Sequence, residues 1–112
     1  MNRKKELKEQ YKQMKSEMGI FVVRFKDSKY YFLETTQNLK GKMNSTKFQL
    51  QNGSHLNKEL QDQWNLHKGN DFVIEVLEKL EYDKDESKTD YSEELSIMKV
   101  IWEEKLEKEN YI

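Results

Sequence analysis

Two histidines and a short acidic run are the residues of this chain that most invite a metal-binding interpretation. His55 and His67 lie 12 residues apart and the chain has no cysteine, so the ligand set and spacing of a structural zinc site are missing. The acidic run 83–86 lacks the glycine and the ligand spacing of a calcium-binding loop. We therefore interpret the run as a solvated loop, and His55 as part of the loop before a helix.

Basic side chains suited to phosphate binding concentrate in the first part of the chain. Residues 1–68 contain 14 Lys and Arg against 7 Asp and Glu, whereas residues 69–112 contain 6 against 14. A basic face would bind a phosphate backbone with an affinity that falls as salt rises. Two alternatives are that the halves neutralise each other across the fold, and that the lysines only confer solubility. The candidates are Arg24, Lys26, Lys29, Lys40, Lys42 and Lys47.

Three segments rich in β-branched and aromatic residues are expected to be strands, because such side chains pack well on a pleated surface. Four polar residues separate the first two, which predicts an antiparallel hairpin. Apolar residues at helical spacing predict four helices, and glycine-containing breaks at 52–54 and 69–70 divide the segments. The predicted strands are 20–25, 30–33 and 72–80, and the predicted helices are 2–17, 36–51, 57–67 and 90–107.

This order predicts an α+β fold, a small three-stranded antiparallel sheet flanked by helices. We expect residues 1–17 to form an N-terminal helical extension and residues 18–112 to form the domain. The apolar stripe of the extension either packs on the sheet or mediates self-association. No apolar run approaches the roughly 20 residues of a membrane span, and the N-terminus lacks the apolar segment of a signal peptide. We therefore expect a soluble, cytoplasmic protein that has no membrane contact.

Several short segments resemble the GIY-YIG nuclease family. Gly19-Ile20-Phe21 is similar to its GIY element, and Thr36–Leu39 to the start of its first helix. The segment from His55 to Trp64 retains all five residues of the pattern H-x-N-x-x-L-Q-x-x-W, which is the most specific match. Residues 72–78 resemble the third strand. The resemblance implies the β-β-α-α-β-α order of that family over 18–112.

The resemblance also implies a set of site residues in which most of the nuclease chemistry is missing. The family is understood to cut phosphodiesters with one divalent metal held by a glutamate, assisted by tyrosine hydroxyls and an arginine. Phenylalanines at 21 and 32 carry no hydroxyl, and lysine lacks the bidentate fork of arginine. The implied catalytic positions are Phe21, Phe32 and Lys42, the implied metal ligand for Mg²⁺ or Mn²⁺ is Glu78, and the implied nucleic-acid contacts are Arg24, Lys40, Lys42, Lys47, His55 and Asn57.

Two placements of the second family element are open. The first aligns Phe32-Leu33-Glu34 with the YIG element and keeps the family's spacing from this element to Asn38. The second aligns Tyr31-Phe32-Leu33 with YIG, which retains a tyrosine hydroxyl but changes that spacing. A shift of one residue moves each side chain to the other face of the sheet. We prefer the first, in which Glu34 could add a second metal ligand if its side chain faces Glu78.

Three functions remain open from the sequence. The first is a catalytically impaired nuclease-like domain that binds DNA or a protein partner. The second is a weak Mg²⁺- or Mn²⁺-dependent endonuclease using Glu78, Lys42 and a tyrosine at 30 or 31, although strand packing also explains those tyrosines. The third is an adaptor acting through its charged N-terminal helix. The oligomeric state is not indicated by the sequence.

Overall fold

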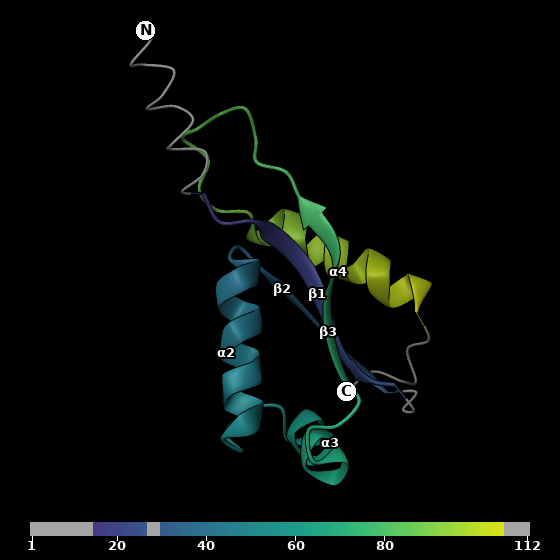
Figure 1. Cartoon of the computed structure of the whole chain (residues 1–112). Coiled ribbons are helices and arrows are strands. Elements are labelled where there is room, and N and C mark those ends of the chain that lie inside the picture. The colour runs from purple at the N-terminus through teal and green to yellow at the C-terminus, as the bar shows by residue number, and fades with distance from the viewer. Residues whose placement is uncertain (1–14, 27–29, 107–112) are drawn as a thin grey trace, which may run out of the picture.

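The sheet at the centre of this computed structural model has three antiparallel strands in the order β2-β1-β3 (Figure 1). The structure describes residues 15–26 and 30–106. The strands are β1 (Met18–Phe25), β2 (Tyr31–Thr36) and β3 (Phe72–Leu80). The central strand β1 pairs with both of the others, so the predicted hairpin and the predicted antiparallel sheet are confirmed.

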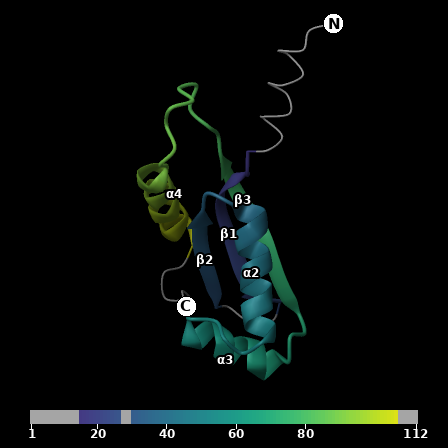
Figure 2. The ribbon, with the colours of Figure 1, turned by 90° about the vertical axis from the view of Figure 1, so that its left-hand side faces the viewer.

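Helices cover both faces of the sheet. The helices α2 (Leu39–Gln51) and α3 (Lys58–His67) pack on one face, and α4 (Ser92–Lys105) packs on the other. Figure 2 shows α2 and α4 on opposite sides of the strands. The α+β class predicted from the sequence is therefore confirmed, and the two sheet faces present different surroundings to any side chain on a strand.

The alternation of side chains along β1 builds both cores. Met18, Ile20 and Val22 pack beneath α4 together with Tyr91, Leu95 and Met98. Phe21, Val23 and Phe25 pack toward α2 and α3 together with Leu39, Leu50 and Leu60. A strand buried on both faces needs apolar residues at consecutive positions, which explains the nearly unbroken apolar run at 20–25.

A β-bulge interrupts the pairing of β1 with β3. Ile20 pairs with Glu78 and the next residue, Phe21, pairs with Val76, so the register shifts by one residue between them. Gly19 lies directly beside this irregularity. A Cβ atom at Gly19 would collide with the backbone carbonyl of Glu78, so only glycine allows β3 to approach this closely.

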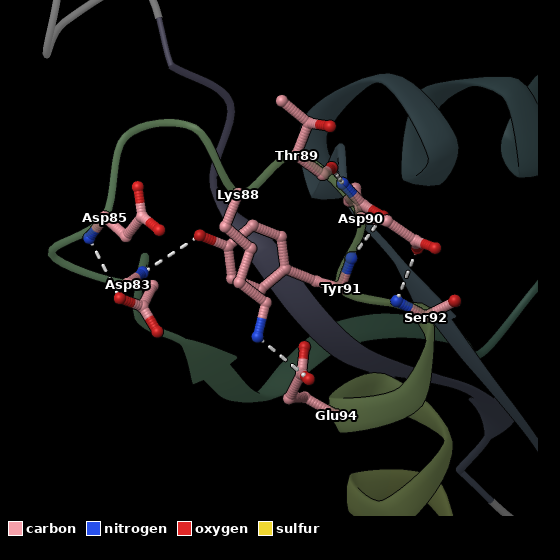
Figure 3. Close-up of polar contacts among 9 residues, drawn as sticks. Asp83, Asp85, Lys88, Thr89, Asp90, Tyr91, Ser92 and Glu94 are labelled. Atoms are coloured by element: carbon pink, nitrogen blue, oxygen red, sulfur yellow. Dashed lines mark hydrogen bonds and ion pairs between the residues drawn. The ribbon is translucent and has the colours of Figure 1, made fainter.

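The segment before α4 is held to the rest of the fold by polar contacts around Tyr91 (Figure 3). The buried Tyr91 hydroxyl accepts a hydrogen bond of 2.9 Å from the Asp83 backbone amide. Gln37 donates to the Thr89 carbonyl at 2.9 Å and accepts from the Tyr91 amide at 3.1 Å. The acidic run 83–86 is therefore part of a hydrogen-bonded connection between β3 and α4.

The helix predicted at 2–17 extends beyond what the structure supports, because residues 15–17 are not helical. The rest of that prediction, residues 2–14, lies outside the described residues. The other predicted helices begin and end within a few residues of the observed ones. Within the part of the chain that the structure describes, no helix is long and apolar enough to span a bilayer.

Candidate functional site

A hollow of about 360 Å³ lies on the α2/α3 face of the sheet, beside the edge strand β2. We call it the β2 hollow. Three elements supply its walls: strand β2, the flank of α2, and the loop that leads into α3. Five of its lining residues were named in the sequence analysis, four as site candidates and Glu34 as a possible metal ligand. The lining residues are Phe32, Glu34, Lys42, Gln49, His55, Leu56 and Asn57.

The charged groups of the β2 hollow are paired with each other. The Lys42 ammonium lies 3.4 Å from a Glu34 carboxylate oxygen, and the two side chains are 43% and 27% exposed. Both remain accessible to water, so the pair is weakly held and its attraction is screened. A phosphate oxygen presented to Lys42 would compete with the Glu34 carboxylate for the same ammonium group.

His55 presents only one of its ring nitrogens to a ligand. Its Nδ1 accepts a hydrogen bond of 3.0 Å from the Asn57 backbone amide, and its ring meets the Phe32 ring edge-on at 5.5 Å. A neutral ring with Nδ1 accepting carries its proton on Nε2, which is a donor suited to a phosphate oxygen. Burial lowers the pKa of His55; the Lys42 charge lowers it further, and the Glu34 charge opposes both effects.

Most of the H-x-N-x-x-L-Q-x-x-W segment has a structural role. The Asn57 side chain caps α3 by accepting from the Leu60 amide at 3.1 Å. The buried Gln61 side chain accepts from the His55 amide at 3.0 Å and donates to the Leu50 carbonyl at 3.0 Å. Trp64 packs edge-on against Phe72. This segment therefore fixes the loop that holds His55 against α2.

The two placements of the second family element differ in which side chain faces the hollow. Phe32 lines the hollow, whereas Tyr31 packs against the core beneath α4 on the other face. The tyrosine-retaining placement therefore does not bring a hydroxyl to the β2 hollow. Phe21 is fully buried in the core below α2 and α3, so it supports the hollow from beneath without lining it.

Glu78 does not lie in the β2 hollow. It is on the opposite edge strand, pairs with Ile20 on the α4 side, and accepts a hydrogen bond of 2.9 Å from the Trp102 indole. Glu34 faces α2 instead, so the hypothesis that Glu34 and Glu78 share a metal ion is wrong. The β-bulge is the physical reason, because it turns Glu78 away from the face that Val76 occupies.

The described residues do not fit a metal site in the β2 hollow beside Lys42. Among the described residues, no group of three or more His, Cys, Asp or Glu side chains is placed to hold an ion. The carboxylate in the β2 hollow is already paired with an ammonium group, and the predicted ligand lies across the sheet. Metal binding at Glu78 stays a prediction, separate from the chemistry of the hollow.

The predicted nucleic-acid contacts are divided among three places. Lys42, His55 and Asn57 meet in the β2 hollow. Lys40 and Lys47 lie two turns apart on the other flank of α2, where Lys40 borders a groove of about 530 Å³ between α2 and β3. Arg24 projects from the α4 side of β1 and lies 3.6 Å from Glu75.

Two features of the α2 side were missed by the sequence analysis. The first is Glu34 as the partner of Lys42, since it was considered only as a metal ligand. The second is Phe48, which is 65% exposed on α2. The signal for Phe48 was present in the sequence, because it falls outside the apolar stripe formed by Leu39, Met43 and Leu50.

Comparisons with known proteins establish the fold. No protein-family model and no curated protein matches the chain. The catalytic domain of homing endonuclease I-TevI, a GIY-YIG nuclease, superimposes with a TM-score of 0.67 at 22% identity, covering 85% of this chain and 97% of that domain. The catalytic domain of intron endonuclease I-TevI with a glutamate-to-alanine substitution superimposes with a TM-score of 0.65 at 22% identity, covering 85% of this chain and 90% of that domain. The chain therefore has a GIY-YIG-like fold, as the sequence motifs predicted.

Proposed function

We propose that this domain binds DNA through its phosphates at the β2 hollow and does not cut it. One observation supports the proposal above the others: Lys42 and His55 converge in a hollow whose described lining residues include no tyrosine. An ammonium group and an imidazole N–H are donors that suit a phosphate oxygen. Phe32, which occupies the implied tyrosine position, can neither donate nor accept a proton.

The charge around the hollow also supports phosphate binding. From Thr35 to Lys58 the chain contains four lysines and neither an aspartate nor a glutamate. This segment includes all of α2 and the loop that carries His55. In a chain that has 21 acidic residues overall, such a segment gives one side of the molecule a positive potential.

We expect no cleavage because of the side chains present in the hollow and the position of Glu78. General acid–base assistance contributes typically 10²–10⁴-fold to such reactions, and the hollow's phenylalanine cannot supply it. The predicted metal ligand Glu78 projects toward α4, so a metal held there would be separated from Lys42 by the sheet. The neighbouring fold is that of an endonuclease domain, which makes DNA the nucleic acid we expect.

The test of binding is fluorescence anisotropy with a labelled 20-base-pair duplex at low and moderate salt. We expect measurable binding at low salt that Lys42→Gln weakens severalfold. Lys84→Gln removes the same charge from the exposed loop before α4 and is the matched control, which we expect to change little. Absence of binding at low salt, or equal losses in both variants, would contradict the proposal and leave a protein partner as the alternative.

The test of cleavage is nicking of supercoiled plasmid in Mg²⁺ or Mn²⁺. We expect the parent protein to leave the plasmid intact. If the parent nicks the plasmid and Glu78→Ala does not, the protein is the metal-dependent endonuclease that the sequence left open. Nicking by both proteins would instead indicate a site that does not use Glu78.

A further inference from the structure

The outward surface of α2 is exposed and contains no acidic residue. Its inward side is formed by Leu39, Met43, Thr46 and Leu50, which are buried or half-buried against the sheet. The residues on its outward side and on the flank away from the β2 hollow are exposed, and none of them is acidic. We call them the α2 crest: Lys40, Asn44, Ser45, Lys47, Phe48 and Gln51.

The α2 crest carries the side-chain chemistry that reads base pairs. Lysine donates to the acceptors of guanine, asparagine and glutamine pair with adenine, and serine contacts either base. Apolar side chains contact the thymine methyl group. Phe48 is 65% exposed, which does not favour solubility, and such a contact would give this exposed ring a function. The outward side of α4, by contrast, combines Ile97, Val100 and Glu104.

The dimensions of α2 suit the major groove of duplex DNA. Its 13 residues extend over about 20 Å, and a helix about 10–12 Å across enters a groove about 12 Å wide. Lys42 lies on one flank of α2, and Lys40 and Lys47 lie on the other. Ammonium groups on both flanks are placed to meet the phosphates of both strands that border the groove.

The lysines of the α2 crest are available for such contacts. No described carboxylate lies within ion-pair distance of Lys40 or Lys47, although Lys42 is paired with Glu34. We propose that the α2 crest reads base-pair edges in the major groove of duplex DNA. This inference rests on the proposed function, which requires only phosphate binding, and adds a sequence preference to it.

The test has two steps. The parent protein is first used to select tight-binding duplexes from a pool with 12 randomised base pairs. The selected duplexes are then methylated with dimethyl sulfate to find the guanines whose methylation interferes with binding. Methylation of guanine N7 blocks contacts in the major groove. We expect enrichment of a short motif, with binding lost when guanines in that motif carry the methyl group. The triple variant N44A/F48A/Q51A should bind the selected duplex about tenfold or more weakly yet retain the parent's affinity for unselected duplex.

The control variant is I97A/V100A/I101A, which removes three exposed side chains from α4 without a change in charge. It should retain the motif preference, and both variants should fold, because alanine is the strongest helix former. If the protein binds all duplexes with equal affinity and guanine methylation does not weaken binding, the inference is overturned and phosphate binding remains the proposed function. Tighter binding to single strands would overturn it in favour of base stacking on Phe48, and no DNA binding at all would overturn the proposed function as well.

Discussion

At the scale of single residues, the most informative side chain of the β2 hollow is Glu34. Its carboxylate lies 3.4 Å from the Lys42 ammonium, which is the group we expect to contact a phosphate. A carboxylate and a phosphate oxygen are both anionic acceptors, so they compete for the same ammonium donor. If the hollow binds DNA as proposed, Glu34 is therefore an internal competitor that weakens this binding.

Removal of this competitor should strengthen DNA binding. We expect Glu34→Gln to bind the 20-base-pair duplex more tightly, by up to about fivefold, because an ion pair that is accessible to water is worth about 0.2–1 kcal/mol. Glu75→Gln is the matched control. Glu75 is also a strand residue that forms an ion pair with a basic residue, Arg24, but it lies on the α4 face of the sheet. Anisotropy titrations of both variants give the result. An equal gain in both would show that net charge alone controls the affinity.

The environment of His55 predicts a pH dependence of stability. Burial lowers the pKa of His55 in the folded chain. The unfolded chain therefore binds the second imidazole proton of His55 more tightly than the folded chain does. The contribution of His55 to stability is therefore complete above its unfolded pKa of about 6.5 and is lost as pH falls toward its folded pKa. Urea unfolding between pH 7.5 and 5 measures this loss.

His55→Gln, which cannot titrate, should show a smaller decline in the free energy of unfolding over that pH interval. His67→Gln retains His55 and is the control for the removal of a histidine. If His55→Gln declines as steeply as the parent, groups other than His55 set the pH dependence.

At the scale of elements, the β-bulge explains which parts of the site could be predicted. Phe32, Lys42, His55 and Asn57 were grouped from the sequence motifs, and the structure brings them together. Glu78 was grouped with them and lies elsewhere. Side chains two residues apart on a regular strand share a face, but the bulge places Val76 and Glu78 on opposite faces. A bulge shifts the phase of a period-two pattern, but the sequence FVIEVLEKL of β3 has no clear alternation in which that shift could be recognised.

The start of α2 is a second feature that the sequence predicted only approximately. The first helix of the domain was predicted from about residue 36 but begins at Leu39, because the Asn38 side chain caps it by accepting from the Gly41 amide at 3.0 Å. A Cβ atom at Gly41 would crowd that side chain, which explains a glycine inside the helix. The strand at 72–80 was predicted at its observed bounds, since its β-branched run has clear breaks on both sides.

The close approach of β1 and β3 predicts that Gly19→Ala destabilises the sheet. The added methyl group would meet the Glu78 carbonyl, which belongs to the backbone and moves only if the bulge rearranges. We expect a loss of about 1–3 kcal/mol in the free energy of unfolding, measured by urea denaturation. Gly53→Ala is the matched control, because a Cβ atom there meets no atom within 4 Å, although its φ of 73° adds some backbone strain. A smaller loss in Gly19→Ala than in Gly53→Ala would contradict this account.

At the scale of the whole molecule, charge is separated across the sheet. Residues 35–58, which include α2, contain four lysines and no acidic residue, whereas residues 81–105, which include α4, contain nine acidic residues and four lysines. None of the ion pairs among the described residues joins α2 to α4. The lysines of α2 are therefore not neutralised by the acidic residues of α4 through any described ion pair, and we expect DNA to approach from the α2 side.

This separation predicts the salt dependence of DNA binding. If Lys40, Lys42, Lys47 and Lys58 each neutralise one phosphate, the logarithm of the binding constant should fall with the logarithm of KCl concentration with a slope of about −3 to −4. The double variant Lys40→Gln/Lys47→Gln should make the slope less steep by about 2, since it removes two contacts. Lys99→Gln/Lys105→Gln makes the same charge change on α4 and should leave the slope unchanged. Equal changes in both double variants would mean that net charge, rather than the α2 surface, governs the binding, and the orientation proposed here would be wrong.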